Sequence, residues 1–147
     1  MKHSIDISFA LELSAPSDQQ IERWAWNVLD DQTEDCSLAI HVVDQSEGRA
    51  LNRDYRGKDY PTNVLAFRAE LHPELELRHL GDIVICAPVV EIEAQQQNKQ
   101  LLDHWAHLVT HGVLHLLGFD HQHPDEAQAM EDREAQLLAR LGISNPY

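Results

Sequence analysis

The hydrophobic pattern of the chain switches between period two and a period of three to four, which predicts strands and helices mixed in one fold. Strands are expected where apolar residues alternate or run on over short β-branched stretches, at residues 4–11, 36–44, 62–67 and 81–87. The last of these stretches is almost continuously apolar, which is typical of a strand in the centre of a sheet.

Helices are expected where apolar residues recur every three to four positions and so form one face. The predicted helices cover residues 19–31, 46–55, 88–99, 99–117 and 124–141. Ser17 or Asp18 can cap the first helix, whereas Gly57 and Gly118 supply stops for two others. Because helices and strands do not strictly alternate, we expect an α+β fold, with a small mixed sheet of about four strands surrounded by helices.

Length and composition fit one globular unit. The chain has 147 residues, of which 43% are hydrophobic, and we expect a single domain over residues 1–147 because this length suits one core. No apolar run reaches the ~18 residues of a membrane span, and no secretory signal is visible, so we expect a cytoplasmic protein. Cys36 and Cys86 form no metal or redox pattern and are expected to be buried, reduced thiols.

Charge is distributed unevenly along the chain. The 11 basic and 25 acidic residues give a net charge of −14, which argues against a partner rich in phosphate. Residues 49–68 carry the opposite sign, because they hold five basic residues against two acidic ones. Arg49, Arg53 and Arg56 of this basic segment fall on one face of a predicted helix, so the segment can dock RNA locally.

The stretch "HGVLHLLGFDH", residues 111–121, holds the candidate metal ligands. His111 and His115 are four residues apart, so on a helix they point to the same side one turn apart. Gly118 can adopt a left-handed conformation that turns the chain back and returns His121 to the other two. Three imidazoles that leave a fourth position for water are typical of catalytic zinc. We therefore predict one Zn²⁺ on His111, His115 and His121, at the end of a long central helix.

Other polar residues lie in or near this stretch. His104 and His107 are expected to lie on the helix surface, and His123 is a weaker alternative to His121 as the third ligand. Asp120 can either orient the second nitrogen of a ligand or cap the last helix.

Gly112 bears on the type of reaction. The spacing His-x-x-x-His-x-x-Gly-x-x-His is that of the metzincin proteases, whose general base is a glutamate directly after the first histidine. Gly112 occupies that position here, and loss of a general base typically costs ~10²–10⁴-fold in rate. A peptidase is therefore disfavoured, and a metal hydrolase of peptides or small molecules is kept as an alternative.

The same stretch resembles the His-Gly-x-Leu-His-Leu-x-Gly-x-Asp-His signature of the YbeY family, bacterial zinc-dependent endoribonucleases. Two further segments resemble other blocks of that family, "LNRDYRGKDYPTNVLAF" at 51–67 and "HLGDIVIC" at 79–86, so the resemblance extends over nearly the whole chain. Asn63 and Ala66 depart from the pattern, because the family usually has Asp and Ser there.

The resemblance implies that His111, His115 and His121 are zinc ligands and that Arg56 is catalytic, unless Arg56 only forms a surface ion pair with Asp59. It also implies a single-strand-preferring endoribonuclease that acts in ribosomal RNA processing, at the 3′ end of the small-subunit rRNA, and in ribosome quality control. Ribosomal RNA and ribosome-associated proteins are then the expected partners. A non-catalytic zinc-containing ribosome-associated factor is a further alternative.

Overall fold

The computed structural model of the chain describes residues 2–10, 14–70 and 78–147. In chain order its elements are β1 (Ser4–Phe9), α1 (Asp18–Leu29), β2 (Cys36–Val43), α2 (Gln45–Arg56), β3 (Val64–Arg68), β4 (Arg78–Cys86), α3 (Ala87–Gln96), α4 (Leu101–Leu116) and α5 (Pro124–Arg140). Each predicted strand and helix is thus present, although position 11 of the first predicted strand lies outside the described residues. β4 begins at Arg78 rather than at residue 81, because its pairing with β2 continues across an irregularity between Ser37 and Leu38.

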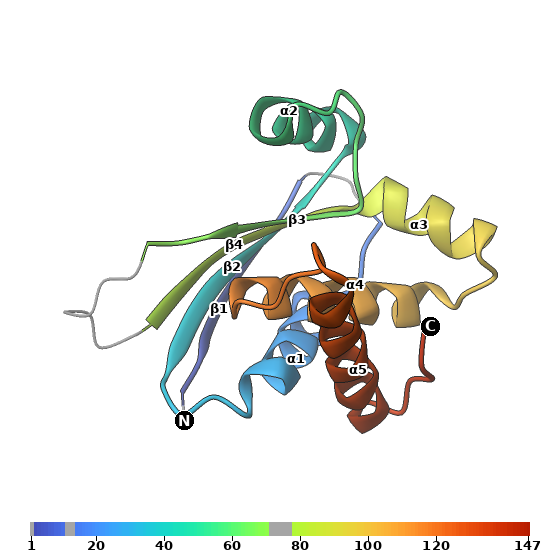
Figure 1. Cartoon of the computed structure of the whole chain (residues 1–147). Coiled ribbons are helices and arrows are strands. Elements are labelled where there is room, and N and C mark those ends of the chain that lie inside the picture. The colour runs from blue at the N-terminus through green and yellow to red at the C-terminus, as the bar shows by residue number, and fades with distance from the viewer. Residues whose placement is uncertain (1, 11–13, 71–77) are drawn as a thin grey trace.

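The strands form one four-stranded sheet in the order β1-β2-β4-β3. β1, β2 and β4 run parallel, and β3 pairs antiparallel with β4. The prediction of an α+β fold with a small mixed sheet is therefore confirmed. Helices α1, α4 and α5 lie on one side of this sheet and α2 on the other (Figure 1).

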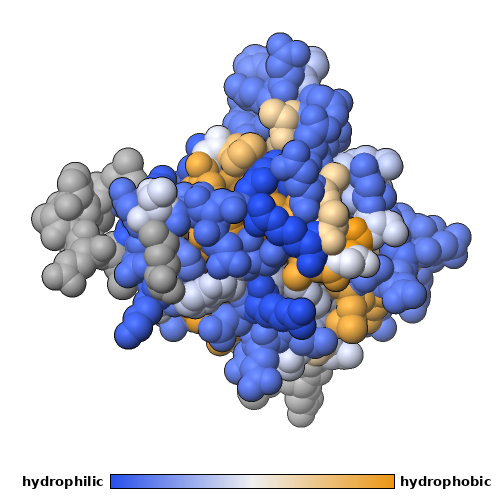
Figure 2. Space-filling model, turned by 90° about the horizontal axis from the view of Figure 1, so that it is seen from below, coloured by the Kyte–Doolittle hydropathy of each residue, from blue (hydrophilic) through white to orange (hydrophobic). Residues whose placement is uncertain are grey.

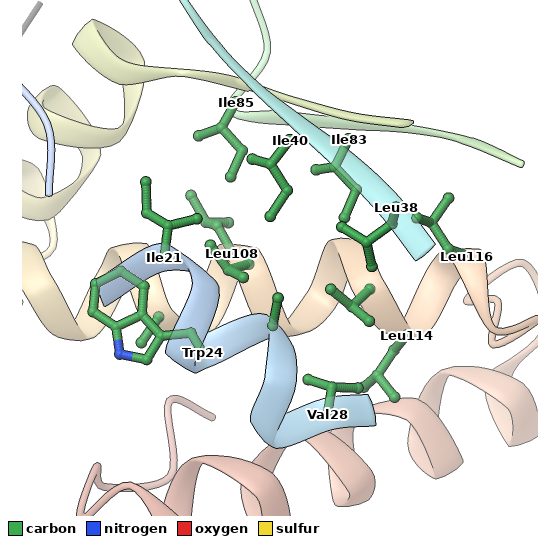
Figure 3. Close-up of a cluster of buried hydrophobic side chains, with 14 of the residues drawn as sticks. Ile21, Trp24, Val28, Leu38, Ile40, Ile83, Ile85, Leu108, Leu114 and Leu116 are labelled. Atoms are coloured by element: carbon green, nitrogen blue, oxygen red, sulfur yellow. The ribbon is translucent and has the colours of Figure 1, made fainter. Parts of the chain in front are cut away.

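The main core fills the space between the sheet and the helices α1 and α4 (Figure 3). Its side chains come from the sheet and from both helices. They include Ile40, Ile83 and Ile85 from the sheet, Ile21 and Val28 from α1, and Leu108 and Leu114 from α4. A smaller apolar cluster, made by Val43, Leu65, Val84 and Cys86 with Leu51 of α2 packed against it, lies on the opposite side of the sheet. Both cysteines are buried free thiols, as predicted.

Local contacts determine where helix α2 begins and ends. α2 begins where the Asp44 side chain accepts a hydrogen bond from the backbone N–H of Glu47, and it ends at Gly57, whose φ is +71°. This ending leaves Arg56 in the last turn of α2.

Seen from the side opposite to α2, the surface is mostly hydrophilic, with apolar atoms in separate spots (Figure 2). Within the described ranges, no helix combines the length and the apolar character that a membrane crossing requires.

Candidate metal centre

α4 carries the first two candidate ligands on one side of its last turns. The rings of His111 and His115 are 4.6 Å apart between centroids, and both side chains are partly buried. The apolar faces of the same helix are held in the main core, because Val109, Val113 and Leu114 are almost completely buried. The core therefore fixes the direction in which the two imidazoles point.

The chain leaves α4 through a tight C-terminal motif. Gly118 has φ of +109°, and its N–H donates to the carbonyl of His115, while the N–H of Phe119 donates to the carbonyl of Leu114. This pair of bonds is a Schellman motif, which needs a left-handed residue at the position of Gly118. The predicted bend at Gly118 is confirmed.

A cation from the sheet supports the same bend. The Arg68 guanidinium, at the end of β3, donates to the carbonyl of His115 at 2.7 Å and to that of Phe119 at 3.2 Å. The carbonyl groups at a helix C-terminus carry partial negative charge, so a guanidinium is favourable there. Arg68 thus ties the loop that follows α4 to the neighbouring strand.

The bend returns His121 to the two helical imidazoles. Its ring lies 5.0 Å from that of His115 and 5.7 Å from that of His111, between centroids. One nitrogen from each of the three residues lies within 4.8 Å of the others, and together they can hold a metal ion. Three imidazoles are a donor set that suits a divalent transition metal such as zinc.

The protonation state of His115 fits that role. Burial, together with the neighbouring rings of His111 and His121, lowers the pKa of His115 to about 4. A metal ligand must be a neutral imidazole, because only the neutral form has a free lone pair. His115 is therefore ready to bind a metal at neutral pH.

Glu134 is a site residue that the sequence analysis missed. This glutamate of α5 is fully buried, and its Oε1 accepts a hydrogen bond from Nδ1 of His111 at 2.6 Å. A signal was present in the sequence, because Glu134 lies at helical spacing between Met130 and Leu138 on the apolar face of α5. A carboxylate on an apolar face is uncommon and points to a specific partner.

The expectation that His104 and His107 lie on the surface is wrong. His104 is 4% exposed and donates to Glu93, whereas His107 donates to Glu134 at 2.7 Å. Both sides of α4 are covered, by α3 and by α5, so helical position alone did not reveal their burial. Among the described residues, neither belongs to the group that can hold a metal.

Two further alternatives are also resolved. His123 is exposed at the N-terminus of α5 and, in the described part of the chain, does not join the metal group. Asp120 accepts a hydrogen bond from the backbone N–H of His121 at 2.7 Å, and the cap of α5 has no side-chain bond. At His111 it is Glu134, and not Asp120, that contacts the second ring nitrogen.

The three histidines line a cleft that also contains Arg56. Its volume is about 610 Å³, within the range of ~300–1,000 Å³ usual for ligand pockets. The cleft lies between the C-terminal half of α4, the start of β3 and the end of α2, and its lining consists of Arg56, Thr62, Asn63, Val64, Leu65, Ala66, His111, Gly112, His115, Asp120, His121 and Gln122.

The other basic residues of α2 are engaged elsewhere. Arg49 holds Asp59 with two hydrogen bonds, at 2.7 Å and 2.9 Å, and Arg53 pairs with Asp54. The alternative ion pair between Arg56 and Asp59 is therefore wrong. Within the described ranges Arg56 has no acidic partner, so its charge is available to the cleft.

Comparison with known proteins gives the chain a family. Residues 7–142 match the family model described as "Endoribonuclease YbeY". The chain belongs to the YbeY family. A relative from Cellvibrio japonicus is 51% identical over 99% of this chain and 84% of its own length, and one from Alkalilimnicola ehrlichii is 56% identical over 90% and 82%. Both relatives are named "Endoribonuclease YbeY".

A solved structure shows the same fold. The chain superimposes on the solution structure of TM1509 from Thermotoga maritima with a TM-score of 0.62, covering 94% of this chain and 91% of that one. Their sequences are 22% identical, so this likeness concerns the arrangement of the backbone.

Asn63, which departs from the YbeY pattern, has hydrogen-bond partners in this structure. The Asn63 amide donates to Glu93 at 3.0 Å, and its carbonyl accepts from the N–H of Val64. Burial acts to raise the pKa of Glu93, but hydrogen bonds from His104 and Asn63 lower it overall. An aspartate at position 63 would instead place a second carboxylate beside Glu93. Ala66 lines the cleft without a polar group, and nothing in the structure explains its replacement of Ser.

Gly112, the first glycine of the YbeY signature, packs closely against the sheet. A Cβ atom at this position would lie 3.0 Å from Cγ2 of Ile83 and 3.4 Å from Cγ2 of Val64. Ile83 is fully buried, and both side chains would have to shift by a few tenths of an ångström to admit that atom. Close contact with β3 and β4 thus disfavours a side chain at the position of the metzincin glutamate.

We expect Gly112→Glu to destabilise the protein by ~1–3 kcal/mol, because its Cβ atom overpacks the contact with Ile83 and Val64. Gly112→Ala should cost less than ~2 kcal/mol, since ~1–3 kcal/mol of overpacking is partly offset by ~1 kcal/mol of helix propensity. Urea unfolding of the three proteins measures both values. A Gly112→Glu variant as stable as the wild type would contradict the packing argument.

Proposed function

We propose that this chain is a metal-dependent endoribonuclease that prefers single-stranded RNA. The observation that supports this most is that Arg56 lines the same cleft as His111, His115 and His121. Cleavage of a phosphodiester needs an activated nucleophile and a cation that meets the charge developing on the phosphoryl oxygens. A metal-binding set of imidazoles beside an available guanidinium provides for both.

The biological substrate is part of the proposal. The chain acts in the cytoplasm on ribosomal RNA, in the maturation of the small-subunit 3′ end and in ribosome quality control, together with the ribosome or ribosome-associated proteins. The resemblance of its motifs to the YbeY family supports this part, and so do the relatives named "Endoribonuclease YbeY". The basic segment at 49–68 offers a local surface for RNA on an otherwise acidic chain.

The metal in the proposal is one Zn²⁺ held by His111, His115 and His121. When bound, zinc supplies Lewis acidity and lowers the pKa of a coordinated water toward neutrality. The chain contributes three neutral imidazoles, a carboxylate that orients His111, and a bend that Arg68 keeps in place. No carboxylate base is needed at position 112, where Gly112 packs closely against Ile83.

Arg56 is the proposed catalytic side chain. Its guanidinium presents a planar fork that can donate two hydrogen bonds to phosphate oxygens. Because Arg49 occupies Asp59, no competing ion pair with that carboxylate holds Arg56 away from the substrate. Arg56 is in the last turn of α2 and lines the same cleft as the three histidines, which supports a contact with the phosphate that is cleaved there.

The test compares an end-labelled single-stranded RNA with the same RNA annealed to its complement. We expect the wild-type protein to produce internal fragments from the single strand, to lose this activity after dialysis against a chelator, and to regain it when Zn²⁺ is returned. A casein-type substrate, incubated in parallel, should remain intact because the position of the peptidase base is glycine.

Each other outcome favours a different hypothesis. Cleavage that survives removal of the metal would indicate a contaminating nuclease and end the proposal. Equal cutting of the duplex would remove the single-strand preference. Turnover of casein that needs the metal would favour the hydrolase of peptides, and RNA binding without cleavage would favour the non-catalytic ribosome-associated factor.

A further inference from the structure

Glu134 has a set of contacts that the hydrolysis step itself does not require. Its Oε1 accepts from Nδ1 of His111 at 2.6 Å, and its Oε2 accepts from Nε2 of His107 at 2.7 Å and from the hydroxyl of Tyr147 at 2.5 Å. The carboxylate is fully buried between α4 and α5. Three donors from three separate positions of the chain therefore converge on one side chain.

The contacts of Glu134 are those of a carboxylate that accepts hydrogen bonds. A buried carboxylate is costly unless it is well hydrogen-bonded, and here three donors meet its two oxygens. An ionised carboxylate can only accept hydrogen bonds.

The acceptor role of the Glu134 carboxylate determines the tautomer of His111. Because Oε1 accepts, Nδ1 of His111 must carry the proton, and the lone pair is then on Nε2. The hydrogen bond also restrains the ring, because Glu134 is fully buried and is itself held by His107 and Tyr147. His111 is thus presented to His115 and His121 with one defined nitrogen free.

We propose that Glu134 is the positioning residue of the metal centre, and that Tyr147 and His107 hold its carboxylate in the orientation that His111 needs. The inference rests on the proposed function only in taking His111, His115 and His121 as the metal ligands. It assigns a role in metal affinity to the segment that follows α5, which runs back toward α4 (Figure 1).

The contribution of Tyr147 is separable from folding. Its side chain is largely exposed, at 59%, and only the hydroxyl reaches the buried carboxylate. The ring also lies edge-on to His107, with centroids 5.5 Å apart. Tyr147→Phe keeps this ring contact and removes one donor from Glu134, so it tests the network without creating a cavity.

The experiment measures Zn²⁺ affinity by competition with a chelating indicator in the wild type and in Glu134→Ala, Glu134→Gln and Tyr147→Phe. We expect Glu134→Ala to weaken Zn²⁺ binding ~10–100-fold, as is usual for loss of the group that orients a metal-binding histidine. Glu134→Gln should lie between this variant and the wild type, since its amide oxygen can still accept one bond. Tyr147→Phe should weaken binding by less than ~10-fold.

A second measurement separates positioning from general stability. Nitrogen-15 NMR of the histidine rings in the metal-free protein reports which nitrogen carries the proton. We expect a protonated Nδ1 on His111 in the wild type and in Tyr147→Phe, and a mixture of tautomers in Glu134→Ala. Glu126→Ala, an exposed glutamate in the first turn of α5, is the matched control and should change neither the affinity nor the ring signals.

Wild-type Zn²⁺ affinity in both Glu134→Gln and Tyr147→Phe would overturn the inference, and so would an unchanged His111 tautomer in Glu134→Ala. If Glu134→Ala does not fold, the other two variants decide. The result is distinct from that of the proposed function, because a wild-type protein that binds Zn²⁺ through this network but cuts no RNA would end the nuclease proposal alone.

Discussion

His115→Ala is expected to abolish measurable cleavage, with a loss of at least ~10³-fold, because a metal ion supplies several kcal/mol of transition-state stabilisation and each ~1.4 kcal/mol is tenfold in rate. His115 is the middle ligand of the three, with its ring 4.6 Å from that of His111 and 5.0 Å from that of His121. Two imidazoles would remain after the change, which are too few to retain a divalent ion. Zn²⁺ binding and RNA cleavage, measured on the same samples, should be lost together.

The matched control for this change is His123→Ala. His123 lies in the chain between α4 and α5 and is exposed, but it does not join the metal group among the described residues. Its replacement should leave Zn²⁺ affinity and cleavage near the wild-type values. Retained Zn²⁺ binding in His115→Ala would contradict the assignment of His115 as a ligand, and loss of binding in His123→Ala would mean that the third ligand has been assigned wrongly.

The second large effect is expected for Arg56→Ala, which should lower the rate of RNA cleavage ~10²–10³-fold, as is typical when one group that stabilises transition-state charge is removed. The affinity for RNA should change much less, because one arginine contributes only part of the contacts to the phosphate backbone. Zn²⁺ binding should be unchanged, since Arg56 lines the cleft but, among the described residues, is not part of the group that can hold the metal. Single-turnover cleavage and RNA binding at one fixed salt concentration measure the two quantities.

Arg49→Ala is the control on the same helix. Arg49 has the same charge but forms an ion pair with Asp59. Removal of Arg49 should therefore alter cleavage far less than removal of Arg56. Arg56→Lys should recover only part of the rate, because an ammonium group cannot form the two-pronged contact of a guanidinium. Equal losses in the Arg49 and Arg56 variants would indicate a general charge effect and remove the specific role of Arg56.

The contrast between the two arginines shows why position in the sequence was not sufficient to assign their roles. Arg49, Arg53 and Arg56 share one helical face, so the sequence treats them alike. Only the position of the loop after α2 decides that Asp59 reaches Arg49 and not Arg56. The availability of Arg56 is thus a consequence of tertiary structure.

The elements of the fold were predictable because their signals are local. Period-two and period-three-to-four patterns, caps such as Ser17, and stops such as Gly57 act within a few residues. The order β1-β2-β4-β3 and the antiparallel pairing of β3 were not predicted. Strand order depends on which segments meet after long connections, and no short-range pattern records that choice.

By itself, the sequence determined the convergence of the three histidines. Helical geometry puts His111 and His115 on one side, and Gly118 provides the turn that returns His121, so these interactions span no more than about ten residues along the chain. Only the tertiary structure decided that Glu134 accepts a hydrogen bond from His111 and that Gly112 packs closely against Ile83. The physical reason is that both depend on which face of α4 meets α5 and which meets the sheet, and that choice is made by packing of the whole core.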